Sequence, residues 1–380
     1  MTELRIDAPN EKQRRFLLDR HRHIAYGGAR GGGKSWAVRT KAKLLALRYA
    51  GIKLLIVRRT LRELQNNHID PLRRELAGIA KYKAADKRFE FPNGSTLTFG
   101  YCACDGDMGQ YQGAEYDVVF LDEAGYCSLV KAAALTAYHC PLTFLGDHMQ
   151  LPPVCEMNDQ SIAATPAVSV WAQSALFVED ALSGRDIAFD YLNHRPASFR
   201  QMKKYDLVHT YRFGESLAAV LAKNVYSAQF HGNPESDTEI FCIHASKQYG
   251  EKNRTNLGEQ IAIQRYLETH ANENIGVITP YRNQREILTK TVKKIGLSPE
   301  TVLTVHGAQG REWDTVLFSV VDTDGKWFTT TLIPKSNGTQ IINTAVSRAK
   351  KKLILVCDCE YWSRQSNELI GKLLQIARPI

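Results

Sequence analysis

Short apolar runs alternate with helical hydrophobic patterns along almost the whole chain. A strand, a helix and a second strand in succession form a βαβ unit, and such units build parallel sheets. Strands are predicted at residues 23–27, 53–57, 118–121, 142–145, 240–244, 275–279, 302–305, 316–321 and 353–357, with a hairpin at 88–99. Helices are predicted at residues 34–49, 61–78, 171–182, 260–269, 283–295 and 340–349. The predicted fold class is α/β, with parallel sheets flanked by helices.

The length of 380 residues exceeds what one hydrophobic core usually covers. The alternation also continues through both halves, so we expect two α/β domains of similar size, at residues 1–190 and 191–380.

The net charge of +9 favours a polyanionic partner such as nucleic acid. An unspecialised basic surface would give the same charge. No run approaches 18 apolar residues and the first residues lack the apolar core of a signal peptide, so we expect a cytoplasmic protein without a membrane partner.

Eight cysteines are too few and too scattered for a disulfide framework in a chain of this length. Cys102 and Cys104 form one close pair, and Cys357 and Cys359 form another. Additional cysteine and histidine residues lie in the first half, at Cys127, His139, Cys140 and His148. Two interpretations are open: a zinc site with unusual spacing, or reduced and mostly buried thiols.

The segment from Gly28 to Ser35 fits the pattern G-x-x-x-x-G-K-[ST] between a predicted strand and a predicted helix. Glycines let the backbone wrap phosphates, and the helix that follows directs its positive end at them. Lys34 is predicted to reach the β- and γ-phosphates of ATP, and Ser35 to ligate Mg²⁺. The predicted ATP-binding residues of this loop are Gly28, Arg30, Gly31, Gly32, Gly33, Lys34 and Ser35.

An apolar strand at residues 117–121 ends in the carboxylates of Asp122 and Glu123. Asp122 is placed to hold Mg²⁺, and Glu123 to orient and deprotonate an attacking water. Gln150 also follows a short core strand, so it can converge with Glu123 on one γ-phosphate. Upstream of the loop, Gln13 is a candidate for reading the adenine edge, with a solvated residue at a helix start as the alternative.

Residues 13–123 resemble the ATPase domain of phage terminase large subunits. The matching segments are the loop with Arg30, Val57-Arg58-Arg59-Thr60, Phe91-Pro-Asn-Gly94 and Tyr111-Gln-Gly113-Ala-Glu-Tyr116. Terminases continue into a nuclease domain, and this sequence has no cluster of acidic residues in that order.

From Leu145 onward the chain resembles a superfamily 1 helicase, in the style of the 5′-to-3′ branch typified by nonsense-mediated-decay helicases. The matches occur in the helicase order at residues 146–153, 210–213, 277–284, 304–312 and 343–349. The resemblance implies two tandem RecA-like domains that hydrolyse ATP between them, with Arg212 and Arg348 as arginine fingers from the second. It also places Gly310 and Glu312 at the nucleotide, with Glu312 on the ribose.

Residues that follow the predicted strands are expected to line one nucleic-acid track, because ligands bind at the carboxyl ends of strands in open α/β sheets. The members are Arg58, Thr60, Thr279, Pro280, Tyr281, Thr304 and His306. Their expected roles are phosphate contacts and base stacking without sequence readout.

The sequence therefore predicts an ATP- and Mg²⁺-dependent translocase or helicase on single-stranded nucleic acid, with DNA favoured over RNA. It is expected to work as a monomer, with a recruiting protein as a possible partner. A DNA-packaging ATPase and an ATP-switched nucleic-acid clamp are the alternatives. The combination of terminase-like and helicase-like halves fits a mobile or viral genome or an engineered chimera.

Overall fold

The computed structural model describes residues 4, 6–28, 31–101, 111, 114–125, 127, 140–147, 149–153, 203–248, 253–323 and 338–380. The chain divides into two compact units. The first comprises residues 1–28, 33–148 and 152–207, and the second comprises residues 29–32, 149–151 and 208–380. The expected domain boundary at 190/191 and the predicted helix at 171–182 lie outside the described residues.

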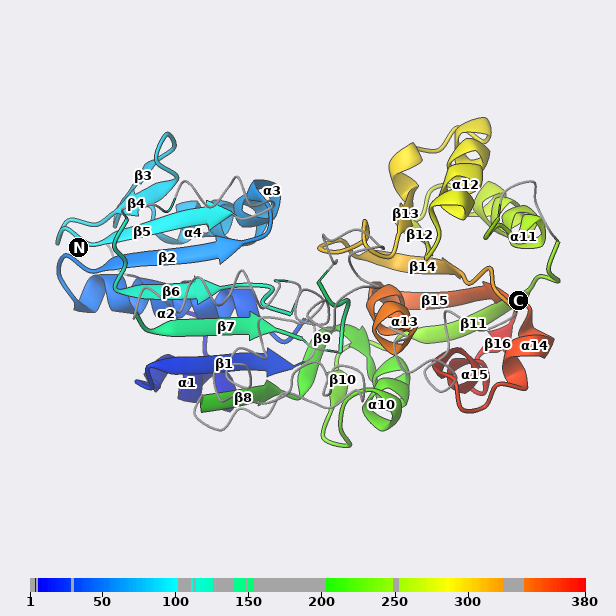
Figure 1. Cartoon of the computed structure of the whole chain (residues 1–380), viewed down its shortest axis with the longest axis horizontal. Coiled ribbons are helices and arrows are strands. Elements are labelled where there is room, and N and C mark those ends of the chain that lie inside the picture. The colour runs from blue at the N-terminus through cyan, green and yellow to red at the C-terminus, as the bar shows by residue number, and fades with distance from the viewer. Residues whose placement is uncertain are drawn as a thin grey trace, which may run out of the picture. The chain divides into compact units, whose positions relative to one another are not determined.

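The first unit is built on an eight-stranded sheet in the order β3-β4-β5-β2-β6-β7-β1-β8 (Figure 1). Its strands are β1 (His23–Gly28), β2 (Lys53–Arg58), β3 (Lys81–Lys83), β4 (Arg88–Glu90), β5 (Thr96–Tyr101), β6 (Val118–Leu121), β7 (Leu142–Gly146) and β8 (Lys203–Leu207). All neighbours from β5 to β8 are parallel, whereas β3, β4 and β5 pair antiparallel. The predicted α/β class is thereby confirmed, and β8 extends the first sheet to Leu207.

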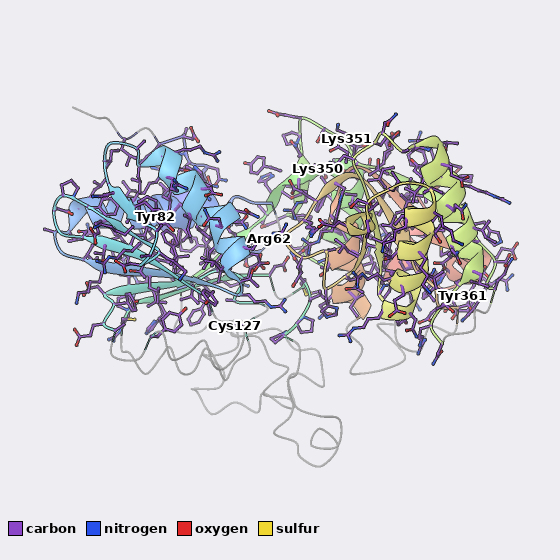
Figure 2. All side chains as sticks on the ribbon, turned by 90° about the horizontal axis from the view of Figure 1, so that it is seen from above. Arg62, Tyr82, Cys127, Lys350, Lys351 and Tyr361 are labelled. Carbon is purple, nitrogen blue, oxygen red and sulfur yellow. The ribbon has the colours of Figure 1, made fainter. Side chains whose placement is uncertain are left out.

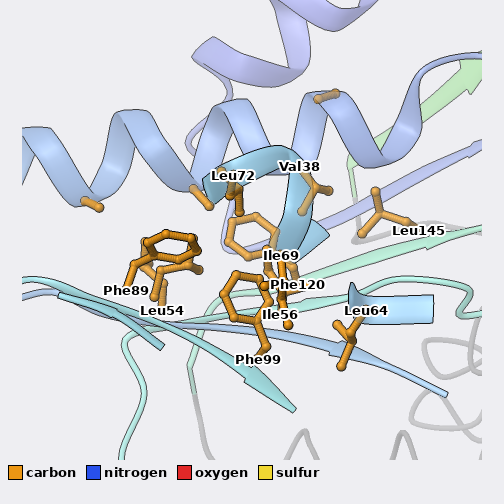
Figure 3. Close-up of a cluster of buried hydrophobic side chains, with 14 of the residues drawn as sticks. Val38, Leu54, Ile56, Leu64, Ile69, Leu72, Phe89, Phe99, Phe120 and Leu145 are labelled. Carbon is orange, nitrogen blue, oxygen red and sulfur yellow. The ribbon is translucent and has the colours of Figure 1, made fainter. Parts of the chain in front are cut away.

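Apolar side chains cover both faces of this sheet, as expected for parallel strands. Leu54 and Ile56 of β2 join one buried cluster, while Leu55 and Val57 join the other. In the first cluster, Val38 of helix α2 (Lys34–Arg48) packs with the strand residues (Figure 3). Helix α1 (Glu11–Leu18) adds its buried Phe16 to the same cluster.

The predicted helix at residues 61–78 is wrong as a single element. The structure has helix α3 (Leu61–Leu64), a π-helical turn η1 (Gln65–Ile69) and helix α4 (Asp70–Glu75). Pro71 stands at the start of α4, and a proline cannot donate the backbone hydrogen bond that a continuous helix requires. Such π segments are frequent at functional sites.

The second unit is built on a six-stranded parallel sheet in the order β13-β12-β14-β15-β11-β16, with a separate pair of β10 and β9. Its strands are β9 (His209–Gly214), β10 (His231–Asn233), β11 (Glu239–His244), β12 (Ile275–Thr279), β13 (Val302–Thr304), β14 (Trp313–Ser319), β15 (Ala349–Cys357) and β16 (Arg378–Pro379). Its helices are α10 (Glu215–Asn224), α11 (Leu257–Thr269), α12 (Arg282–Lys294), the short 3₁₀ helix η4 (Pro299–Thr301), α13 (Gly338–Val346), α14 (Cys359–Ser363) and α15 (Leu369–Leu374).

Helices α11 and α12 cover one face of this sheet through Ile263 and Leu288, which share a buried cluster with Val277, Leu317 and Ile354 (Figure 1). The predicted helix at 340–349 is corrected at its end. It stops at Val346, and β15 begins at Ala349.

Candidate functional site

The described residues of the phosphate-binding pattern stand at the end of β1 and at the start of α2. Gly28 has φ 103° and a Cβ there would lie 2.5 Å from the carbonyl oxygen of Leu207, so only glycine fits. Gly33 has φ 77° and starts α2 without a side-chain cap, and Lys34 Nζ donates to the Gly28 carbonyl at 2.8 Å. A helix start that no side chain caps suits an anion, because its N–H groups require acceptors. Arg30 lies outside the described residues.

Ser35 and Asp122 meet although 87 residues separate them in the sequence, with Ser35 Oγ donating to Asp122 Oδ2 at 3.2 Å. The sheet order explains this contact. A single strand, β7, lies between β1 and β6, and the three strands are parallel, so their carboxyl ends lie at the same edge of the sheet. A hydroxyl and a carboxylate are oxygen ligands of the kind that Mg²⁺ prefers. The two residues therefore fit the predicted metal site.

Two further residues hold Asp122, and neither was predicted to do so. Arg58 Nη1 donates to Asp122 Oδ2 at 2.8 Å, and His68 Nε2 lies 2.8 Å from the same oxygen. Asp122 is 4% exposed and His68 is fully buried. Burial raises the pKa of Asp122, but Arg58, His68 and Lys34 outweigh it and hold that pKa well below its usual value. Burial lowers the pKa of His68, against the attraction of Asp122.

Glu123 adopts a left-handed backbone with φ 64°, which is uncommon for a residue other than glycine. Arg58 Nη2 donates to Glu123 Oε1 at 2.8 Å, and the Glu123 side chain is 38% exposed. The next residue, Ala124, donates its N–H to the carbonyl of Leu145 in β7. Strained backbone of this kind clusters at functional sites. The Asp122 carboxylate therefore points inward, while the Glu123 carboxylate is accessible.

Gln13 is buried and lies beside the phosphate loop. Its Oε1 accepts from Asn10 N at 3.0 Å in a capping box at the start of α1. Its Nε2 lies 2.6 Å from the place where a Cβ on Gly33 would stand. The solvated alternative for Gln13 is therefore wrong, while its contact with adenine stays a prediction.

Gln150 lies in the second unit and is 8% exposed. The residues on either side of it are held by α13. Asn343 Nδ2 donates to the carbonyl of Met149 at 2.8 Å, and Leu151 N donates to Thr344 Oγ1 at 3.1 Å. The position of Gln150 is thus tied to the helix that leads to Arg348.

Arg348 is fully buried directly before β15. Its Nε donates to the carbonyl of Thr344 at 3.0 Å. Both terminal nitrogens of its guanidinium have no hydrogen-bond partner within the described part of the chain. The role of Arg348 as an arginine finger stays a prediction.

Arg212 and Glu312 contact each other. Arg212 Nε donates to Glu312 Oε2 at 2.7 Å, and Lys350 Nζ lies 2.8 Å from Glu312 Oε1. Lys350 and its neighbour Lys351 are labelled in Figure 2. Burial raises the pKa of Glu312, but Arg212 and Lys350 outweigh it and hold the pKa below its usual value. Gly310 precedes this cluster with φ 80°. The ribose contact of Glu312 and the finger role of Arg212 stay predictions.

The expected nucleic-acid track needs one correction in the first unit. Arg58 is 4% exposed and bound to the acidic pair, so it does not lie on a surface that a strand could contact. Thr60 is half-buried and caps α3, because its Oγ1 accepts from Glu63 N at 3.3 Å, and its contact with nucleic acid stays a prediction.

In the second unit, β12 and β13 bring two predicted track residues into register, Thr279 beside Thr304. His306 is exposed beyond them, whereas Thr279 is fully buried. Pro280 is half-buried after the end of β12, and Tyr281 Oη donates to Asp322 Oδ2. The exposed residues after β12 and β13 are compatible with a nucleic-acid track, and their role stays a prediction.

A buried polar network lies at the carboxyl end of β14, in the same sheet as β12 and β13. Glu259 of α11 accepts from Ser319 Oγ at 2.5 Å and from Val321 N at 2.8 Å. Val321 has φ 74°, which is an outlier for a β-branched residue. Burial and the charge of Asp322 raise the pKa of Glu259 to about 8, against the hydrogen bonds from Ser319, Val321 and Asn256. Glu259 was not predicted to have a role.

The zinc interpretation receives no support from the described residues, in which no group of three or more His, Cys, Asp or Glu could hold a metal ion. Cys102, Cys104, His139 and His148 lie outside them. The part of the chain that the structure describes also contains no helix long and apolar enough to cross a membrane.

Comparisons with known proteins give one family match, in which residues 242–360 match an AAA domain. The chain is 25% identical over 268 residues to the DNA replication ATP-dependent helicase/nuclease JHS1 of Arabidopsis thaliana, covering 63% of this chain and 19% of that protein. It is 24% identical over 291 residues to Helicase sen1 of Schizosaccharomyces pombe, covering 71% and 16%. The chain thus spans less than a fifth of the length of these two relatives.

Two solved structures are similar over most of the chain. One is the complex of Arterivirus nonstructural protein 10 (helicase) with DNA, at 17% identity and a TM-score of 0.48, covering 95% of this chain and 64% of that one. The other is the large terminase from a thermophilic bacteriophage, at 11% identity and a TM-score of 0.42, covering 94% and 90%.

Proposed function

We propose that this chain, a relative of superfamily 1 helicases, is an ATP-driven translocase or helicase that acts on single-stranded nucleic acid. The observation that carries the proposal is the contact of Ser35 with Asp122, with Glu123 next to it in a turn that leaves its carboxylate accessible. A phosphate loop alone serves many reactions. A second carboxylate beside the metal ligand favours hydrolysis, because it supplies a base for water.

Each residue has a distinct part in the proposed reaction. The start of α2 and Lys34 bind the phosphates, and Ser35 with Asp122 would hold Mg²⁺, which neutralises charge on the β- and γ-phosphates when bound. Glu123 orients the attacking water and accepts its proton. Gln150 senses the γ-phosphate. Arg348 and Arg212 stabilise the charge that develops on the transferred phosphoryl group.

The partner proposed for the chain is single-stranded DNA rather than RNA. The positive charge and the exposed residues at the ends of β12 and β13 support a strand bound through its backbone. The names of several relatives refer to DNA replication or to DNA helicase activity, which agrees with this preference. The proposed working form is a monomer, with a recruiting protein as a possible additional partner.

The first experiment measures ATP hydrolysis with no nucleic acid, with single-stranded DNA and with RNA of equal length. We expect stimulation by DNA in the wild type. Lys34→Ala should lose both nucleotide binding and turnover, because it removes a charge-assisted phosphate contact. Glu123→Gln should still bind ATP but not hydrolyse it. Turnover at the wild-type rate in Glu123→Gln would show that Glu123 is not the base.

A second experiment separates a motor from an ATP-switched clamp. A motor should displace streptavidin from one end of a biotinylated strand in the presence of ATP, whereas a clamp should only dissociate. The DNA-packaging ATPase, suggested by the terminase-like first half, predicts ring assembly and stimulation by a portal protein instead. Monomeric, DNA-stimulated turnover would exclude that alternative.

A further inference from the structure

Three cysteines and one histidine come together at the carboxyl ends of β11 and β15. Cys242 and His244 occupy alternate positions on β11, and His244 lies beside Cys357 in the parallel register. Alternate residues of a strand share one face of the sheet, so the register places the two cysteines on that face. Cys359 follows two residues later at the start of α14, the helix that carries Tyr361 (Figure 2).

Direct contacts join these groups. Cys359 N donates to His244 Nδ1 at 3.2 Å, and the Cys359 thiol donates to the carbonyl of Cys357 at 3.6 Å. The Cys359 thiol also interacts electrostatically with the neighbouring thiols of Cys242 and Cys357. Cys357 is fully buried, whereas Cys242 and Cys359 are both half-buried. Two of these three neighbouring thiols are thus partly accessible and the third is not.

The three thiols differ in their readiness to ionise. The hydrogen bonds from Cys357, Cys242 and His244 lower the pKa of Cys359 to about 6, against the effect of burial. Burial and the neighbouring Cys359 raise the pKa of Cys242 to about 11. The pKa of Cys357 is raised well above its usual value by Cys359, by burial and by the charge of Glu259. Its neighbours therefore favour ionisation of Cys359 over ionisation of Cys242 or Cys357, and a thiol whose pKa is lowered in this way is the more reactive one.

We propose that Cys359 is a peroxide-reactive cysteine and that Cys242 is its resolving partner, so that mild oxidation closes a Cys242–Cys359 disulfide. The Cys359 sulfur attacks one peroxide oxygen, the O–O bond breaks, and the departing hydroxide takes a proton from solvent to become water. Cys359 is then a sulfenic acid. The Cys242 sulfur attacks the Cys359 sulfur, the S–O bond breaks, and the thiol proton leaves with the hydroxyl group as a second water.

The test uses the full chain, treated with hydrogen peroxide at pH 7 and then with N-ethylmaleimide after denaturation. Mass spectrometry should find the tryptic peptide of Cys242 joined to the peptide of Cys359, while Cys127 and Cys140 are labelled as in the untreated protein. Cys359→Ser should lose the joined peptides, and Cys357→Ser should keep them. Cys242→Ser should give a Cys359 sulfenic acid that dimedone traps.

A second measurement separates a reactive cysteine from a merely close pair. The alkylation rate of Cys359 should rise with a midpoint near pH 6, and at pH 7 it should exceed that of an ordinary thiol by roughly threefold. His244→Asn should move the midpoint upward. Joined peptides that persist in Cys359→Ser, a midpoint near that of an ordinary thiol, or stoichiometric zinc that protects these thiols would each overturn the proposal.

Discussion

Arg58 Nη1 and Asp122 Oδ2 lie 2.8 Å apart in a setting where both side chains are 4% exposed. The pair joins the end of β2 to the end of β6, two neighbouring strands of the first sheet. Arg58 Nη2 contacts Glu123 as well, so one guanidinium orients both carboxylates of the acidic pair. Arg58 is therefore a positioning residue of the proposed hydrolysis site.

Arg58→Met should destabilise the chain by about 3–5 kcal/mol, because it leaves Asp122 buried without its main cation. The loss should show in urea unfolding near neutral pH. The pKa of Asp122 is lowered in the folded state, so this stabilisation is present above its unfolded value of 3.8 and declines as the pH falls below it. Arg59→Met, at the exposed next residue, is the matched control and should change stability by less than about 0.5 kcal/mol. Equal effects of both changes would contradict this role.

Arg348→Met should lose roughly a thousand-fold in nucleic-acid-stimulated turnover, which is the typical contribution of an arginine finger. Without nucleotide its stability should stay equal or increase, because the change removes a buried guanidinium of which two nitrogens have no hydrogen-bond partner among the described residues. Arg348→Lys should not rescue turnover, since a point charge does not reproduce the planar fork. Arg364→Met, which changes an exposed arginine, is the control. A large loss of stability with turnover intact would assign Arg348 a structural role.

Binding to single-stranded nucleic acid should weaken steeply as salt rises and should hardly depend on sequence. Each neutralised phosphate releases a counterion, so the logarithm of the binding constant falls linearly with the logarithm of salt concentration. Fluorescence anisotropy with a labelled oligonucleotide and a scrambled one of equal length measures both properties. A preference of more than about tenfold for one sequence would mean that base edges are read.

Glu259→Gln should stabilise the chain at alkaline pH. The pKa of Glu259 is raised from 4.5 to about 8, so the folded chain binds more protons than the unfolded chain between these values. The free energy of unfolding therefore falls as the pH rises through that window. Glutamine keeps an acceptor for Val321 N and has no charge to bury. The increase in the free energy of unfolding relative to wild type should be small at pH 4.5 and reach a few kcal/mol above pH 8.

The control for this change is Glu268→Gln, at an exposed position of the same helix. It should leave the pH dependence of unfolding unaltered. A difference between Glu259→Gln and wild type that stays constant across the window would show that Glu259 does not titrate there.

The phosphate loop, the acidic strand end and the α/β class could be predicted because each depends on local spacing or periodicity. The resemblance to superfamily 1 helicases rested on ordered motifs and is confirmed by the comparisons. The partners of Asp122 could not be predicted in this way. Arg58 reaches it only because β2 is the neighbour of β6, and His68 only because a π-helical turn interrupts the expected helix. Alternation of strands and helices does not specify which strands are neighbours.

The role of Glu259 could not be predicted for a related reason. It stands in an amphipathic helix where its spacing looks like that of any polar residue. Its burial arises from the end of β14, where Ser319 and Val321 close over it. Pro71 was the one local signal for the π-helical turn, since a proline inside a helical pattern indicates an interruption.

The left-handed backbone of Glu123 has a consequence for protein engineering. A glutamate in this conformation costs about 1 kcal/mol relative to a residue without a Cβ. A directed-evolution campaign scored only on heat resistance would weigh this strain against the contact of Glu123 with Arg58, and a glycine selected at this position would discard the proposed base. Thermostable variants of this chain should be sequenced at residue 123 before any loss of turnover is attributed to rigidity.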